Sequence, residues 1–279
     1  MRLFDTHCHF ETADAGKIAS ILVRAKSAGV EKLMAVGGSP TLNASAMLAF
    51  SEGRRMKEEG RSSDIPEVIY AVGLDRDQAT SSQTPPLTHS PTHPLPHSPT
   101  HLPSAWGEIG LDYYYSPETR DAQITLFASQ LEEAKRRNLP VVIHTRDAAE
   151  DTLAVLKDIP SRGIIHCFTG TPQEAKSYLD LGFYVSISGI VTFRAADNVR
   201  ETALYVPDDR ILIETDSPFL APVPMRGKAN EPAFIVHTCE FLAKLRGIAP
   251  DDFAELTFAN AESILEASMH CTGDSSAQH

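Results

Sequence analysis

Two histidines near the N-terminus, one residue apart, have the spacing of a metal-binding pair. His7 and His9 flank Cys8 at the end of an apolar segment that reads as a strand. In a strand, side chains two residues apart point to the same face, and the residue between them points away. Both imidazoles can therefore bind one ion, whereas Cys8 is expected to face the surrounding helices as a small apolar residue. Two incidental histidines would give the same pattern.

Four further metal-competent residues lie far apart in the sequence but share one placement. Each lies in or just after a short apolar segment, at or near its C-terminal end: Glu108 in WGEIGLD, His144 in VVIHTRD, His166 in GIIHCF and Asp216 in ILIETDSP. A single histidine on an apolar strand is usually a core residue with satisfied hydrogen bonds. Several polar groups buried side by side are costly without an ion, so the six residues together favour a metal site.

This set of four histidines and two carboxylates predicts a centre of two divalent ions, such as Zn²⁺, Mn²⁺ or Fe²⁺. Glu108 is the candidate bridge between them. Two ions about 3.5–4 Å apart activate a water and stabilise both oxygens of a hydrolysed ester, as phosphodiester cleavage requires. Asp216 is expected to ligate and to accept the proton of the water, which makes Glu108 and Asp216 the candidate catalytic residues. Glu214 is expected to orient one of the metal-binding side chains without binding the ion itself.

Short apolar segments alternate with helix-like segments about eight times, which is typical of a parallel sheet wrapped by helices. The predicted strands are Leu3–His9, Lys32–Gly37, Val68–Leu74, Trp106–Leu111, Val141–Thr145, Gly163–Phe168, Tyr184–Gly189 and Ile211–Asp216. The predicted helices are Gly16–Ala28, Thr41–Glu59, Glu118–Asn138, Ala148–Asp158, Pro172–Leu181, Pro232–Arg246 and Pro250–Ala267. This pattern predicts an α/β fold, a single-domain (β/α)8 barrel over residues 1–279, although periodicity alone also permits an open doubly wound sheet. In a barrel, the C-terminal strand ends meet at one mouth, where the six ligands would converge.

One stretch, residues 78–104, is rich in proline, histidine, serine and threonine and lies where the third helix of a barrel would run. Its proline density predicts an exposed, largely disordered loop in place of that helix. His89, His93, His97 and His101 recur in it every four residues, which fits weak metal capture or simple repeat expansion. Residues 269–279 are expected to form a flexible C-terminal tail.

Basic residues near the predicted mouth are candidate substrate contacts. Arg226, Lys228 and Asn230 lie in PMRGKANEP after the eighth strand, and Arg146 follows His144. Such groups suit an anionic phosphate, but ordinary surface charge explains them equally well. The net charge of −12 argues against a broad basic surface for long nucleic acid. A P-loop and a G-x-S-x-G serine motif are both absent from the sequence.

The bulk composition is that of a globular protein, with 42% hydrophobic and 22% charged residues. The sequence contains no apolar run of about 18 residues and no secretory signal pattern, and its four cysteines are widely spaced. These features predict a cytoplasmic protein without membrane association. They indicate no obligate protein partner.

Seven segments together resemble the TatD family of metal-dependent deoxyribonucleases, from the first residues to about Leu265. They are FDTHCHF, GEIGLDYYY, LPVVIHTRDA, GIIHCFTG, YVSISG, LIETDSPFLAP and RGKANEP. The resemblance implies an amidohydrolase-like TIM barrel with divalent-metal nuclease activity on DNA, as an exonuclease that acts on ends, and two divalent ions (Mg, Mn or Zn) are expected. Single strands are also expected substrates, because a barrel mouth admits a strand more readily than an undistorted duplex. It also implies that the family's metal positions fall on His7, His9, Glu108, His144, His166 and Asp216.

One segment departs from the family pattern. Such proteins usually carry a G-x-H-P-like turn after the third strand, whereas this chain reads VGLDRDQ, with Asp75 in place of the histidine.

Two alternatives to a deoxyribonuclease remain. One is a metallohydrolase of C–N or carboxylic ester bonds, because the same centre polarises carbonyls. The other is an inactive scaffold whose repeat loop binds a partner.

Overall fold

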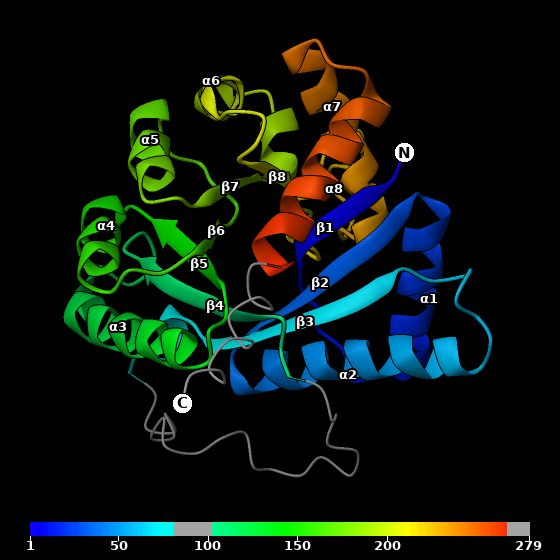
Figure 1. The fold of residues 1–279 in the computed structure, drawn as a ribbon, viewed down its shortest axis with the longest axis horizontal. Helices are drawn as coiled ribbons and strands as arrows, with labels where there is room; N and C mark the ends of the chain where they lie inside the picture. The colour runs from blue at the N-terminus through cyan, green and yellow to red at the C-terminus, as the bar shows by residue number, and fades with distance from the viewer. Residues whose placement is uncertain (81–101, 267–279) are drawn as a thin grey trace, which may run out of the picture.

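The computed structural model describes residues 1–80 and 102–266, and these form the predicted (β/α)8 barrel (Figure 1). Eight parallel strands pair in chain order. They are β1 Leu3–Cys8, β2 Val30–Gly38, β3 Glu67–Leu74, β4 Ala105–Asp112, β5 Val141–Arg146, β6 Gly163–Ile165, β7 Tyr184–Ile187 and β8 Ile211–Ile213. A parallel bridge between Cys8 and Ser217 joins β1 to the chain just after β8, so the barrel is nearly closed.

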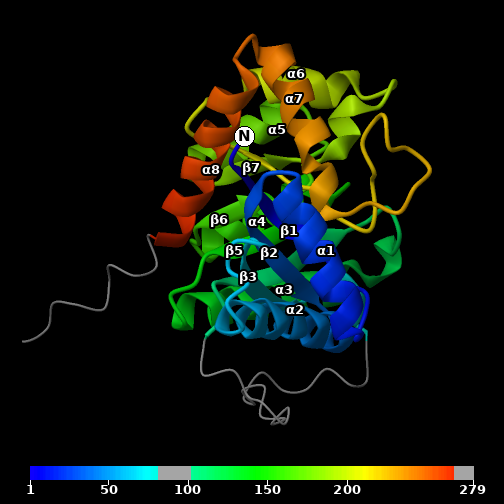
Figure 2. The same cartoon turned by 90° about the vertical axis from the view of Figure 1, so that its right-hand side faces the viewer.

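Helices follow the strands and cover the outside of the barrel (Figures 1 and 2). The α-helices are α1 Ala15–Ser27, α2 Pro40–Glu58, α3 Arg120–Arg136, α4 Ala149–Asp158, α5 Pro172–Asp180, α6 Asp197–Tyr205, α7 Ile235–Arg246 and α8 Pro250–Glu266. Four short 3-10 helices add η1 Arg76–Gln78, η2 Pro117–Thr119, η3 Gly189–Thr192 and η4 Pro232–Phe234. None of the helices in the described ranges combines the length and the hydropathy that a membrane span requires.

Side chains at the helix starts explain where several helices begin. Asp14 caps α1 by accepting hydrogen bonds from two backbone N–H groups of its first turn, and Ser39 does the same for the N–H of Leu42 in α2. At α5, Thr171 and Glu174 form a reciprocal capping box. These caps satisfy donors that the helix itself leaves unpaired.

The segment between β3 and β4 is the part of the barrel where the sequence predicted no regular helix. Its described residues, 75–80 and 102–104, hold only η1. Most of the predicted loop 78–104, including His89, His93, His97 and His101, lies outside the described residues. The predicted tail 269–279 lies outside them as well.

Two apolar layers hold the barrel together. Leu3, Leu33 and Ile143 belong to the layer between strands and helices. The barrel interior is filled by residues from successive strands, such as Phe4, Met34 and Val142. Three residues of α8 complete this inner cluster: Phe258, Ala261 and Ile264. The helix thus packs against the interior at the end that carries the start of β1, which leaves the C-terminal strand ends as the open mouth.

Candidate metal centre

The six predicted ligands all lie at the mouth, on five strands or just beyond them. His7 is in β1 and His9 follows it, while Glu108 and His144 lie within β4 and β5. His166 and Asp216 come shortly after the ends of β6 and β8. Cys8 packs in the layer between strands and helices, as predicted. The close approach of β4 to β5 requires a glycine at position 110, where a Cβ atom would lie 2.0 Å from the carbonyl oxygen of His144.

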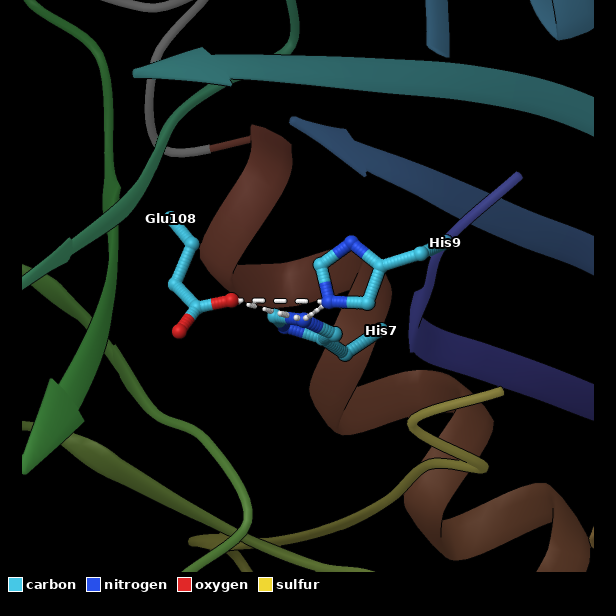
Figure 3. A group of neighbouring side chains, drawn as sticks. All are labelled: His7, His9 and Glu108. Atoms are coloured by element: carbon cyan, nitrogen blue, oxygen red, sulfur yellow. Dashed lines mark hydrogen bonds and ion pairs between the residues drawn. The ribbon is translucent and has the colours of Figure 1, made fainter. Parts of the chain in front are cut away.

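A first group of donors surrounds one oxygen of Glu108 (Figure 3). Glu108 Oε2 lies 3.5 Å from both His7 Nε2 and His9 Nε2, and these two nitrogens are 3.1 Å apart. Asp216 Oδ1 lies 3.8 Å from His7 Nε2 and 3.6 Å from His9 Nε2. Two imidazoles and two carboxylates therefore converge on one small volume.

A second group of donors surrounds the other oxygen of Glu108. Glu108 Oε1 lies 3.4 Å from both His144 Nδ1 and His166 Nε2. These two nitrogens are 3.3 Å apart. The two oxygens of one carboxylate thus face two different pairs of histidines.

The spacing of these donors fits bound divalent ions. A tetrahedral ion with ligand bonds of about 2.1 Å has ligand atoms roughly 3.4 Å apart. The distances in both groups cluster around this value, from 3.1 to 3.8 Å. Imidazole and carboxylate are also the donors that zinc, manganese and iron accept. The residues present therefore suit two neighbouring ions that share Glu108.

Three of the four histidines are oriented through their second ring nitrogen. His9 Nδ1 lies 2.9 Å from the Val36 carbonyl oxygen. His144 Nε2 lies 2.9 Å from Asp112 Oδ2, and His166 Nδ1 lies 3.3 Å from Glu214 Oε1. Such partners fix the tautomer and the ring orientation of a ligating histidine. Glu214 was predicted for this role, whereas Asp112, the last residue of β4, was not.

The turn after β3 brings two further charged groups to the centre that the sequence did not indicate as site residues. Arg76 Nη1 donates a hydrogen bond of 2.9 Å to Glu108 Oε1, and Arg76 Nε lies 3.9 Å from Asp112 Oδ2. Asp75, which replaces the expected histidine, is buried beside Glu108. Residues in a short turn follow no hydrophobic periodicity, so the sequence gives no sign that their side chains point into the site. The departure from the family's turn was the one feature that drew attention to this segment.

Burial and mutual charge shift the pKa values of the clustered groups. Burial opposes a charge on Glu108, but the facing histidines, His166 foremost, hold the pKa of that carboxyl well below its usual range. Burial also opposes a proton on His166, yet Glu108 and Glu214 raise the pKa of His166 well above its usual value. Burial dominates at Asp216 and raises the pKa of that carboxyl to about 7. It lowers the pKa of His7 to about 3.

The four predicted substrate contacts lie in three kinds of environment. Arg146 and Arg226 stack on aromatic rings, with the guanidinium carbon 3.8 Å from the Tyr114 ring centroid and 3.9 Å from that of Phe193. Lys228 is exposed. Asn230 is buried, and its amide donates to the carbonyl oxygens of Thr215 and Phe219. These two hydrogen bonds stabilise the loop after β8, so we leave Asn230 out of the proposed phosphate contacts.

An eight-stranded parallel barrel with histidines and carboxylates gathered at its mouth defines the class of metal-dependent hydrolases. The comparisons with known proteins agree. Residues 4–266 match the family model described as TatD related DNase. The chain therefore belongs to the TatD family.

Curated relatives support the same family. The chain is 50% identical over 159 residues to the uncharacterized metal-dependent hydrolase YcfH of Escherichia coli K12, a match that spans 56% of this chain and only 60% of YcfH. It is 34% identical over 268 residues to the uncharacterized metal-dependent hydrolase YabD of Bacillus subtilis, covering 94% of this chain and 98% of YabD. A third relative, the 3'-5' ssDNA/RNA exonuclease TatD of a Rahnella strain, is 39% identical over 173 residues, covering 59% of this chain and 65% of that protein.

A solved structure gives the same result for the fold. The TatD homologue YJJV of Escherichia coli K12 superposes with a TM-score of 0.74 at 27% identity. The superposition covers 94% of this chain and 97% of YJJV.

Proposed function

We propose that this chain is a divalent-metal-dependent hydrolase that cleaves phosphodiester bonds of DNA, from an end or in single-stranded form. The proposal rests on the two carboxylate oxygens of Glu108, which face different pairs of histidines. Oε2 faces His7 and His9, and Oε1 faces His144 and His166. A carboxylate placed in this way suits a pair of ions, and paired ions suit phosphodiester cleavage. The name of the Rahnella relative, an exonuclease, supports the same substrate class.

Each residue has a role that follows from its position. When bound, divalent ions supply Lewis acidity and a nucleophilic water near neutral pH. Glu108 holds a negative charge between the two groups of histidines. Asp216 is suited to take a proton from the attacking water, because its Oδ1 lies within 4 Å of the Nε2 atoms of His7 and His9, beside the volume that a metal ion would occupy. Asp112 and Glu214 keep His144 and His166 oriented.

The proposed substrate contacts lie at the rim. Arg146 is two residues after His144 on β5, so both side chains share one face of the strand. Its guanidinium can donate two parallel hydrogen bonds to two oxygens of one phosphate. Arg226 and Lys228, exposed in the loop after β8, are proposed as further phosphate contacts.

A nuclease assay with three metals tests the proposal. A single-stranded oligonucleotide labelled at one end is incubated with the protein and Mg²⁺, Mn²⁺ or Zn²⁺, and the products are separated by length. We expect release of mononucleotides by the wild-type protein and by Glu240→Ala, which changes an exposed glutamate of α7, but not by Glu108→Ala. Turnover of amides or lactones alone would overturn the proposal, and so would the absence of turnover with every metal.

A further inference from the structure

Two neighbouring tyrosines are exposed at the rim of the mouth. Tyr114 and Tyr115 expose 58% and 65% of their surface, although large aromatic side chains are normally buried. Their ring centroids are 4.9 Å apart, and the rings are nearly perpendicular. The guanidinium carbon of Arg146 lies 3.8 Å from the Tyr114 centroid and 5.0 Å from that of Tyr115. We call these three residues the tyrosine platform.

The platform is tied directly to the candidate metal centre. Asp112 Oδ1 accepts hydrogen bonds from the backbone N–H groups of Tyr114 and Tyr115, at 3.0 and 3.1 Å. The other oxygen of the same carboxylate lies 2.9 Å from His144 Nε2. One buried side chain therefore positions both a proposed metal ligand and the two tyrosines.

A second anchor holds the segment from the helix side. The Tyr113 hydroxyl donates a hydrogen bond of 2.7 Å to Asp151 Oδ2 in α4. Arg120, at the start of α3, pairs with both oxygens of Asp151. The backbone that carries the platform is thus fixed on two sides, so this backbone needs little ordering when a ligand binds.

The charge of the platform is suited to an anion. Within residues 1–80 and 102–266, no carboxylate lies within ion-pairing distance of the Arg146 guanidinium. The chain as a whole carries a net charge of −12, so an anionic polymer is attracted only where such local cations lie. Aromatic faces beside a cation are the pattern with which proteins bind unpaired bases and their phosphates.

We propose that the tyrosine platform binds one nucleotide of single-stranded nucleic acid, with its base stacked on a tyrosine ring and its phosphate on Arg146. The proposal rests on the proposed function and names the residues that would hold an unpaired nucleotide beside the metal centre. A base inside a duplex is already stacked between its neighbours, so only an unpaired base can use the platform. The platform therefore selects frayed ends and single strands.

Equilibrium binding to two matched oligonucleotides tests this proposal. Both are dye-labelled hexamers with phosphorothioate linkages, one of thymidines and one abasic, so they carry equal charge but differ in bases. Fluorescence anisotropy measures their Kd with the metal-loaded protein. We expect the thymidine hexamer to bind at least about fivefold more tightly than the abasic one, the lower limit for stacking one base.

Variants assign this preference to the platform. Tyr114→Ala/Tyr115→Ala is expected to bring the ratio of the two Kd values close to one, whereas Tyr114→Phe/Tyr115→Phe retains the rings and the ratio. Tyr205→Ala, at an exposed tyrosine of α6, is the matched control and should leave the ratio unchanged. An equal Kd for both hexamers in the wild type, or a ratio that survives the double alanine change, overturns the platform. Nuclease activity in the earlier assay would remain in that case, which separates this failure from failure of the proposed function.

Discussion

At the scale of single residues, Glu108 connects the two halves of the candidate centre. The sequence predicted the six ligands because each is a metal-competent residue at the end of an apolar strand. It predicted the orienting role of Glu214 because this residue lies two positions before Asp216, on the same strand face. Asp112 and Arg76 were missed, because their roles depend on which atom faces which across the mouth.

The Arg76 guanidinium occupies the same Glu108 oxygen that a metal ion between His144 and His166 would bind. Its Nη1 lies 2.9 Å from Glu108 Oε1, the oxygen that faces His144 and His166. We expect Arg76→Met to lower the Kd for Mn²⁺ at least about threefold, because a positive charge next to a dication is removed. Competition with a chelator measures the change, and Arg54→Met, at a partly exposed arginine of α2, is the control. Weaker metal binding by Arg76→Met would instead mean that Arg76 holds Glu108 in position.

The shifted pKa values predict how metal binding depends on pH. Asp216, with a pKa raised to about 7, and His166, with a pKa raised well above its usual value, both hold protons at pH 6. A metal ion binds only the deprotonated forms and must displace these protons. Metal affinity should therefore rise from pH 6 to pH 8, with protons released on binding. Calorimetry in buffers of different ionisation enthalpy measures the release, and an affinity independent of pH would contradict the assignment.

At the scale of elements, the strands were predicted better than the helices. Every predicted strand is present, since a buried parallel strand is a short apolar run with clear limits. The helix α6 was not predicted: it follows Ala196, which provides no side-chain cap, whereas α5, also of nine residues, begins with the capping box of Thr171 and Glu174. The strands β6 and β8 were predicted to extend further than they do, because the chain leaves the sheet before His166 and Asp216.

The helix α8 should contribute to stability without affecting the centre. Phe258 is 3% exposed, and its ring centroid lies 5.6 Å from that of Phe4 in the barrel interior. Phe258→Ala should lower the free energy of unfolding by about 3–5 kcal/mol through loss of buried surface and a remaining cavity. Denaturant unfolding measures the loss, and Leu204→Ala, at an exposed leucine of α6, is the control. If Phe258→Ala changed metal affinity as much as a substitution of a metal ligand does, α8 and the metal centre would not be independent.

At the scale of the whole molecule, eight successive parallel strands bring residues from position 7 to position 216 to one mouth. The periodicity of the sequence predicted this architecture, and the family match confirms it. Which donors pair with which oxygen of Glu108 could not be predicted, because that depends on strand register and tilt. The irregular register of β1 against β2 between Asp5 and Cys8, for example, is not visible in the sequence.

Anomalous scattering from crystals of the Mn²⁺-loaded protein tests the central claim most directly. We expect two peaks about 3.5–4 Å apart, one on each side of Glu108. The first should lie among His7, His9 and Asp216, and the second between His144 and His166. A single peak, or two peaks that do not share Glu108, would contradict the account.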